Sequence, residues 1–167
     1  MNELKNFLQN DYFGNSGMNY LIFISAIFLG LIFKGLISKY LSKLLYSVIG
    51  NREKRVGQNK FDELLTKPIS QFVMLTFIFF GANKLSFPET WNLANVDEIG
   101  TRMFLSKGFT IIYIYSIFII IKRLISFFGI LLQKRAEESE SKMDDQLVPF
   151  AIEIIRFFSY ILLIFVI

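Results

Sequence analysis

Long apolar runs separated by short polar stretches dominate the chain. The first run begins at Met18, and no charged residue occurs between Asp11 and Lys34. Such a stretch supplies the about 20 apolar residues that a helix needs to cross the hydrocarbon core of a bilayer. Beyond Lys34, polar side chains recur at three- and four-residue spacing until Gly50, which is typical of an amphipathic helix. The pattern predicts one helix over 18–49, whose basic end protrudes from the bilayer or lies along the headgroups.

Three further apolar runs follow. The second covers 68–85, and the third has its core at 108–121 with a basic amphipathic tail after it. The fourth covers about 145–167. Between the second and third runs, Pro88 is expected to stop the helix, since proline cannot continue the helical hydrogen bonding. Trp91, the only tryptophan, fits an anchor at the membrane interface.

These runs predict an all-α, integral membrane fold with four transmembrane helices arranged as two tandem helical hairpins. The expected segments are a polar N-terminal segment outside the membrane at 1–17, a first hairpin at 18–85, an outer loop at 86–100 and a second hairpin at 101–167 that ends inside an apolar helix. For 1–17, a short helix on the membrane surface and a loosely ordered terminus both fit the pattern. The competing hypothesis is a soluble bundle. The short charge-free cores of the second and third helices favour it, and the lack of a strongly polar helical face speaks against it.

A short polar motif stands before the second and the fourth apolar runs. We call residues 60–68 the first elbow and residues 142–149 the second elbow. Four positions match between them, namely Lys60 with Lys142, Asp62 with Asp144, Glu63 with Asp145, and Leu65 with Leu147. The prolines, Pro68 and Pro149, are offset by one position. The match indicates a duplicated helical hairpin, although a chance match of four positions is the alternative.

The composition fits a membrane protein and excludes several kinds of chemistry. Hydrophobic residues make up 53% of the chain, and there are 20 phenylalanines, more apolar side chain than a soluble domain of this length can bury. Cysteine and histidine are absent, which removes thiolate metal sites, disulfides and the commonest general base. We expect no catalytic residue, no metal and no cofactor. The net charge of +4 suits loops facing anionic lipid better than nucleic acid.

The distribution of basic residues predicts the orientation. The region 34–67 holds eight basic residues, whereas 85–106 holds one. Because cytoplasmic loops carry the excess of Lys and Arg, the N-terminus and the 86–100 loop are expected outside, and both elbows in the cytoplasm.

The elbows suit a structural role better than a catalytic one. Asp144 and Asp145 are adjacent, so on a helix they project about 100° apart and are not the facing carboxylates of a hydrolase. Carboxylates at a helix start complement the helix dipole and satisfy free N–H groups, worth about 0.5–2 kcal/mol. Pro68 and Pro149 can kink the helices a turn or more later. A hinge and a simple helix cap are both open interpretations.

Other charged positions are candidates for contact with the membrane. The candidates for binding anionic lipid headgroups are Lys34, Lys39, Lys43, Lys122 and Arg123, with snorkelling to the interface as the alternative. Glu153 and Arg156 are three residues apart on the fourth helix, where they can pair inside the membrane.

At the second elbow the sequence resembles the small-conductance mechanosensitive channel family. The family pattern Asp-Asp-x-Leu-x-Pro, entering an apolar helix, is matched by Asp144, Asp145, Leu147 and Pro149. The first elbow, with Asp62, Glu63, Leu65 and Pro68, resembles the equivalent elbow in larger members. The resemblance implies the bacterial inner (plasma) membrane, a homo-oligomer that is commonly a heptamer, and peripheral helices that sense bilayer tension.

The chain departs sharply from that family. It contains no Gly/Ala-rich pore helix and no cytoplasmic vestibule, so we expect the tension-sensing part of a longer subunit, with ion permeation only if the missing pore is present. The alternatives are a small accessory membrane protein that binds partner helices or lipid and, less favoured, a small-solute transporter. An enzyme is least favoured.

Overall fold

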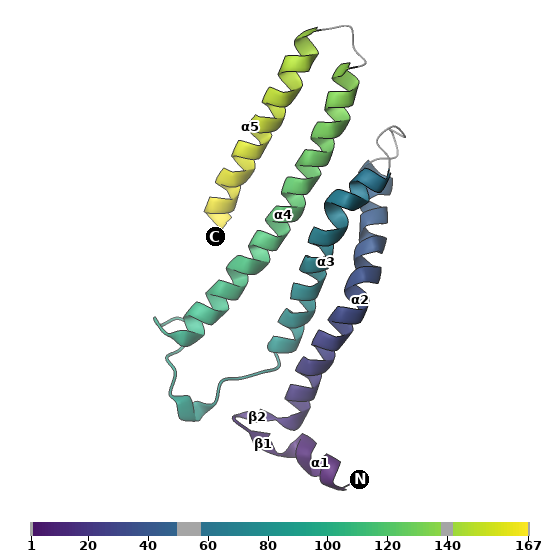
Figure 1. Ribbon diagram of the computed structural model, residues 1–167. Coiled ribbons are helices and arrows are strands. Elements are labelled where there is room, and N and C mark those ends of the chain that lie inside the picture. Colours follow the sequence, from purple (N-terminus) through teal and green to yellow (C-terminus); the bar gives the residue numbers. More distant parts are fainter. Residues whose placement is uncertain (1, 50–57, 138–141, 167) are drawn as a thin grey trace. The chain divides into compact units, whose positions relative to one another are not determined.

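The structure is a computed structural model that describes residues 2–49, 58–137 and 142–166. Most of the described chain is helical (Figure 1). The elements are α1 (Asn2–Gln9), β1 (Asp11–Tyr12), β2 (Asn15–Ser16), α2 (Gly17–Ile49), α3 (Gln58–Ala82), the 3-10 helix η1 (Glu89–Trp91), α4 (Thr101–Glu137) and α5 (Lys142–Val166). Four of them, α2 to α5, are long and apolar enough to cross a membrane.

The chain divides into two compact units. Unit 1 comprises Met1–Gly35 and Val73–Ile112, and unit 2 comprises Leu36–Phe72 and Tyr113–Ile167. The divisions fall inside α2, α3 and α4, so each of these helices contributes to both units. We describe each unit by itself.

In unit 1, α2 and α3 pack antiparallel through two glycines. A Cβ added to Gly30 would lie 2.9 Å from the Cβ of Phe77, and one added to Gly81 would lie 2.9 Å from the Cβ of Ala26. Small residues at a helix interface let the two backbones approach closely and pack. The α4 helix joins them through a stacked ring pair, Phe79 and Phe109, with centroids 5.6 Å apart.

The N-terminal segment of unit 1 is ordered against the loop after α3. Strands β1 and β2 form a two-residue ladder, and the turn between them places Phe13 and Gly14 at positive φ (53° and 78°), the requirement of a tight hairpin turn. The Asn15 side chain and Ser86 exchange two hydrogen bonds: Asn15 Nδ2 donates to the Ser86 carbonyl at 2.7 Å, and the Ser86 N–H donates to Asn15 Oδ1 at 2.7 Å. The N-terminal hairpin is thus fixed to the residue 86 region.

Unit 2 has a close-packed aromatic core. Phe61 of α3 and Phe127 of α4 are fully buried and meet edge to face with centroids 4.7 Å apart. Tyr46 of α2 adds a third ring, 5.4 Å from Phe61. The α5 helix packs antiparallel on α4 near Gly129, where a Cβ would lie 2.9 Å from Ile152 Cδ1.

The predicted helices agree with the structure, apart from the start of the second. The bounds of α2 match the predicted 18–49, and α4 begins at the predicted position. The α3 helix begins at Gln58, ten residues before the predicted apolar run at 68–85. The helix extends because Phe61 and Leu65 share one face and are both fully buried. Of the two interpretations of the N-terminal segment, a short helix holds only for α1, because residues 11–16 form a hairpin.

Candidate functional site

The first elbow lies inside a helix rather than at its start. Asp62 is the fifth residue of α3, so it does not cap that helix. Instead, its Oδ1 accepts a hydrogen bond of 2.6 Å from the hydroxyl of Ser42 on α2. Ser42 is fully buried, and a hydrogen bond to a carboxylate is about twice as strong as one between neutral groups. The elbow acid therefore ties α3 to α2.

The remaining first-elbow residues divide into a buried and an exposed group. Leu65 and Pro68 are buried, and Pro68 lies within α3, which bends near its N-terminal end in Figure 1. Glu63 points away and pairs with Lys60 at 2.9 Å on the surface. An exposed pair of this kind contributes little to stability.

The second elbow occupies a different environment. Asp144 and Asp145 are the third and fourth residues of α5, in its first turn, and their side chains lie outside the described residues. Leu147 is 54% exposed, whereas its counterpart Leu65 is fully buried. Pro149 is exposed, unlike Pro68. The two elbows match in sequence but not in packing.

The basic candidates lie mostly on the surface. Lys39, Lys43 and Arg123 are exposed, and Lys34 is half-buried. Lys122 is also exposed, and its Nζ lies 5.3 Å from the centre of the Tyr160 ring on α5. A cation over an aromatic face is attracted by the ring quadrupole, so Lys122 contributes to the contact between α4 and α5.

The charged pair on α5 forms at the surface. Arg156 Nη1 donates to Glu153 Oε1 at 2.7 Å, and the side chains are 35% and 68% exposed, respectively. The Nε of Arg156 is shielded and has no partner among the described residues. The pair therefore lies on the exposed side of α5. Only 6% of the apolar 18-residue stretch of this helix is buried.

Trp91 lines a pocket in unit 1 that the sequence did not predict. The cavity has a volume of about 960 Å³. Its walls come from the N-terminal hairpin, from α2, α3 and α4 near their ends, and from the segment between α3 and α4. The lining residues are Phe13, Asn15, Tyr20, Phe23, Phe79, Ala82, Asn83, Leu85, Ser86, Phe87, Pro88, Trp91, Val96, Arg102, Leu105, Ser106, Phe109 and Thr110.

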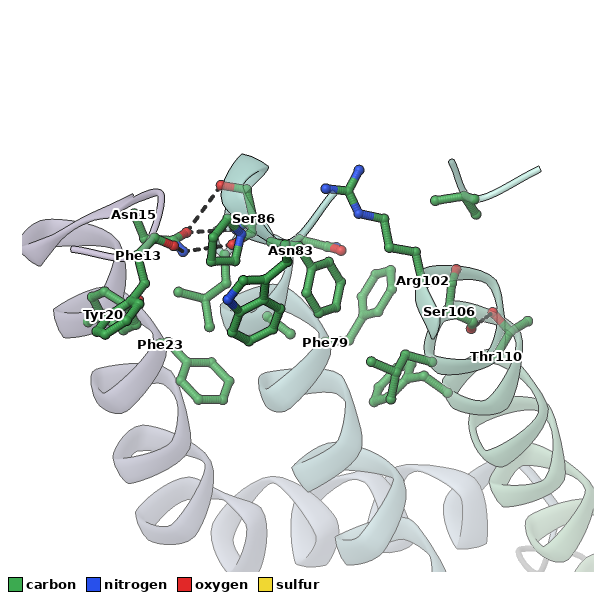
Figure 2. A pocket seen from close by; sticks show the side chains of 18 residues that line it. Phe13, Asn15, Tyr20, Phe23, Phe79, Asn83, Ser86, Arg102, Ser106 and Thr110 are labelled. Carbon is green, nitrogen blue, oxygen red and sulfur yellow. Dashed lines mark hydrogen bonds between the residues drawn. The ribbon is translucent and has the colours of Figure 1, made fainter. Parts of the chain in front are cut away.

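The pocket is polar on one side and apolar on the other. Figure 2 shows Asn15, Ser86 and Arg102 on the loop side, and Phe23 and Phe79 on the side of the helix bodies. Among the described residues that line the pocket, Arg102 alone is charged. Its guanidinium carbon lies 5.6 Å from the centre of the Phe87 ring, and its Nε is shielded from solvent without a hydrogen-bond partner among the described residues.

Among the described residues, no group of three His, Cys, Asp or Glu side chains could hold a metal ion. The site residues that the sequence missed are Arg102 and the serine of the Ser42–Asp62 bond. Ser38 and Ser42 did carry a signal, since polar residues four apart share one helix face, and both are fully buried. Arg102 belongs to no sequence motif, so the sequence gave no reason to single it out.

The chain matches no protein-family model, no curated protein and no solved structure.

Proposed function

We propose that this chain is the lipid-embedded, tension-sensing region of a mechanosensitive ion channel subunit. The observation that carries the proposal is the uncovered apolar surface of the helices. In the apolar 18-residue stretch that could cross a membrane, only 11% of α2 and 6% of α5 is buried. Helices that are apolar on their open sides need lipid or protein around them. Helices bathed in lipid on much of their surface are suited to follow changes in the bilayer.

The proposal includes the orientation and the setting. The N-terminal segment and the 86–100 loop face outside, and both elbows face the cytoplasm of a bacterial inner membrane. The subunits assemble into a homo-oligomer. The basis is the excess of basic residues in 34–67 and the resemblance at the second elbow. Sensing is the role proposed for residues 1–167. Conduction needs a Gly/Ala-rich helix, which these residues do not contain.

Tension acts on such a region only if it favours one arrangement of the helices over another. The contrast between the elbows suggests where a change can occur. In the first elbow, Asp62 is hydrogen-bonded to Ser42 and Leu65 is buried. In the second elbow, Leu147 and Pro149 are exposed. We therefore assign the movement to α5, with α2 and α3 as the fixed part.

The absence of cysteine allows a direct test. Spin labels at Leu44→Cys on α2 and Phe158→Cys on α5, both exposed and both in unit 2, report the distance between the helices in liposomes. Adding lysolipid to one leaflet mimics tension, and we expect the distance distribution to shift. The matched control is Phe28→Cys with Phe80→Cys in unit 1, beside the Gly30 and Gly81 contacts, where no shift is expected.

A second candidate function is that of an accessory membrane protein that binds partner helices. The ion pair of Glu153 and Arg156 favours it, since a charged pair on an open face of a spanning helix is costly in lipid unless protein or water covers it. The same labels separate the two hypotheses. An α2–α5 distance that lysolipid leaves unchanged contradicts tension sensing and favours the accessory role.

A further inference from the structure

We propose that the pocket of unit 1 binds an anionic amphiphile, a molecule with an acidic headgroup and an acyl chain. The headgroup contacts Arg102, and the chain lies along the aromatic wall. The inference is independent of tension sensing, because it concerns binding to unit 1 alone and is measured without tension.

The size of the cavity fits such a ligand. Pockets that bind small molecules commonly measure about 300–1,000 Å³ and have mostly apolar walls with a few polar groups. This one has a volume of about 960 Å³. Seven of its lining residues are aromatic, namely Phe13, Tyr20, Phe23, Phe79, Phe87, Trp91 and Phe109.

The charge of the pocket selects an acidic headgroup. Arg102 lines it, and none of the lining residues that the structure describes is acidic. In the described part of the chain, the Nε of Arg102 lacks an acceptor although it is shielded from solvent. A shielded donor without a partner is unfavourable, so an anionic acceptor bound here would be stabilised. A carboxylate or a phosphate fits best, because the guanidinium fork binds both with two parallel hydrogen bonds.

The position of Arg102 along the chain strengthens this argument. Arg102 is the second residue of α4, whose 37 residues begin at Thr101. The positive end of a helix dipole disfavours a cation in the first turn and favours an anion there. Ser106 lies one turn further on the same face of α4 and also lines the pocket, so its hydroxyl can join Arg102 at one headgroup.

The pocket is amphipathic in the direction that such a ligand requires. Arg102 and Ser86 lie on the loop side, and Phe23 and Phe79 lie on the side of the helix bodies (Figure 2). If α2, α3 and α4 cross a bilayer, the loop side is at the headgroups and the aromatic side in the hydrocarbon. A free inorganic anion would contact only the loop side of the pocket, and a neutral apolar molecule would contact only the aromatic side.

Trp91 provides the measurement, because it is the only tryptophan and lines the pocket. In neutral detergent, a fatty acid brominated on its acyl chain quenches Trp91 on contact. We expect saturable quenching by the acid and about tenfold weaker binding of its methyl ester, the loss that follows from one charge-assisted interaction. Brominated phosphatidylglycerol against brominated phosphatidylcholine in nanodiscs repeats the comparison for a phosphate headgroup.

The variants test the assigned residue. Arg102→Gln is expected to reduce binding of the acid to the level of the ester. Lys107→Gln is the matched control, since Lys107 is an exposed cation on the same helix that does not line the pocket, and it should leave binding unchanged. Thr110→Phe narrows the pocket and leaves Arg102 in place, so it should weaken binding of the acid and of the ester alike.

Three results overturn the proposal. The first is equal affinity for the acid and the ester in the unmodified chain. The second is an equal loss of acid binding in Arg102→Gln and Lys107→Gln. The third is full competition by inorganic phosphate at the concentration of the acid, which indicates a site for a free anion. If Arg102→Gln does not fold, as judged by circular dichroism, the acid–ester comparison and Thr110→Phe decide the question.

Discussion

Unit 1 and unit 2 use parts of the same helices in opposite ways. Proline apart, Val73 is the one buried apolar side chain of unit 1 among the described residues, and the others, among them Phe61, Leu65 and Phe127, belong to unit 2. Unit 2 fills its centre with interlocking rings, whereas unit 1 holds its helices together by glycine contacts and leaves a cavity of about 960 Å³. Both units contain many phenylalanines, so composition does not decide which unit is close-packed.

The difference lies in how the rings meet. In unit 2, Phe61 and Phe127 come from neighbouring helices and meet edge to face, the favoured geometry for a ring pair. In unit 1, rings such as Tyr20 and Phe87 line an open space that the N-terminal hairpin and the residue 86 region border. The close-packed rings that α2, α3 and α4 contribute to unit 2 suit a fixed support for α5, and the hollow of unit 1 suits a ligand.

The largest effect is expected from opening a cavity in unit 2. Phe127→Ala removes a fully buried ring and should lower the free energy of unfolding by about 3–5 kcal/mol, through lost packing contacts. The measurement is unfolding by SDS in mixed micelles, followed by circular dichroism. Phe128→Ala is the control, because that ring is 43% exposed and should change stability far less. Similar losses in both variants would show that Phe127 is not a core residue.

A smaller effect is expected from the polar tie in unit 2. Asp62→Ala leaves the hydroxyl of Ser42 buried without its acceptor and should cost about 1.5–3 kcal/mol, the range for hydrogen bonds to charged groups. Glu63→Ala removes the neighbouring exposed acid, and its pair with Lys60 should be worth no more than about 1 kcal/mol. The same unfolding assay compares them. Equal losses would mean that the Ser42–Asp62 bond does not stabilise the hairpin.

The smallest effects, of opposite sign, are expected from two glycines of unit 1. Gly30→Ala forces a methyl group against Phe77 and should destabilise by about 1–3 kcal/mol. Gly35→Ala should stabilise by about 0.5–1 kcal/mol, since in the described part of the chain the added Cβ would meet no atom within 4 Å beyond its chain neighbours and the nearby backbone of its own helix, and alanine favours the helix. The unfolding midpoints should therefore move in opposite directions. If Gly30→Ala were stabilising, the close approach of α2 and α3 would be disproved.

Local sequence predicted the helices better than it predicted their contacts. The bounds of α2 followed from an apolar run with an amphipathic tail. The early start of α3 did not, because Gln58 and Lys60 are polar, and the burial of Phe61 against Phe127 extends the helix. The hairpin at Asn15 was missed for a similar reason, since its bonds go to Ser86, 71 positions away.

The two elbows separate what the sequence determines from what the tertiary structure decides. The sequence by itself determined four helices of membrane-spanning length, because the length of an apolar run is set against the fixed thickness of a bilayer. Leu65 and Leu147 stand in matching motifs, yet the first is buried and the second exposed. Only the tertiary structure decided this, as it did the Ser42–Asp62 bond and the Arg102 pocket. A side chain's environment is made by neighbours from other helices, and a local motif does not encode them.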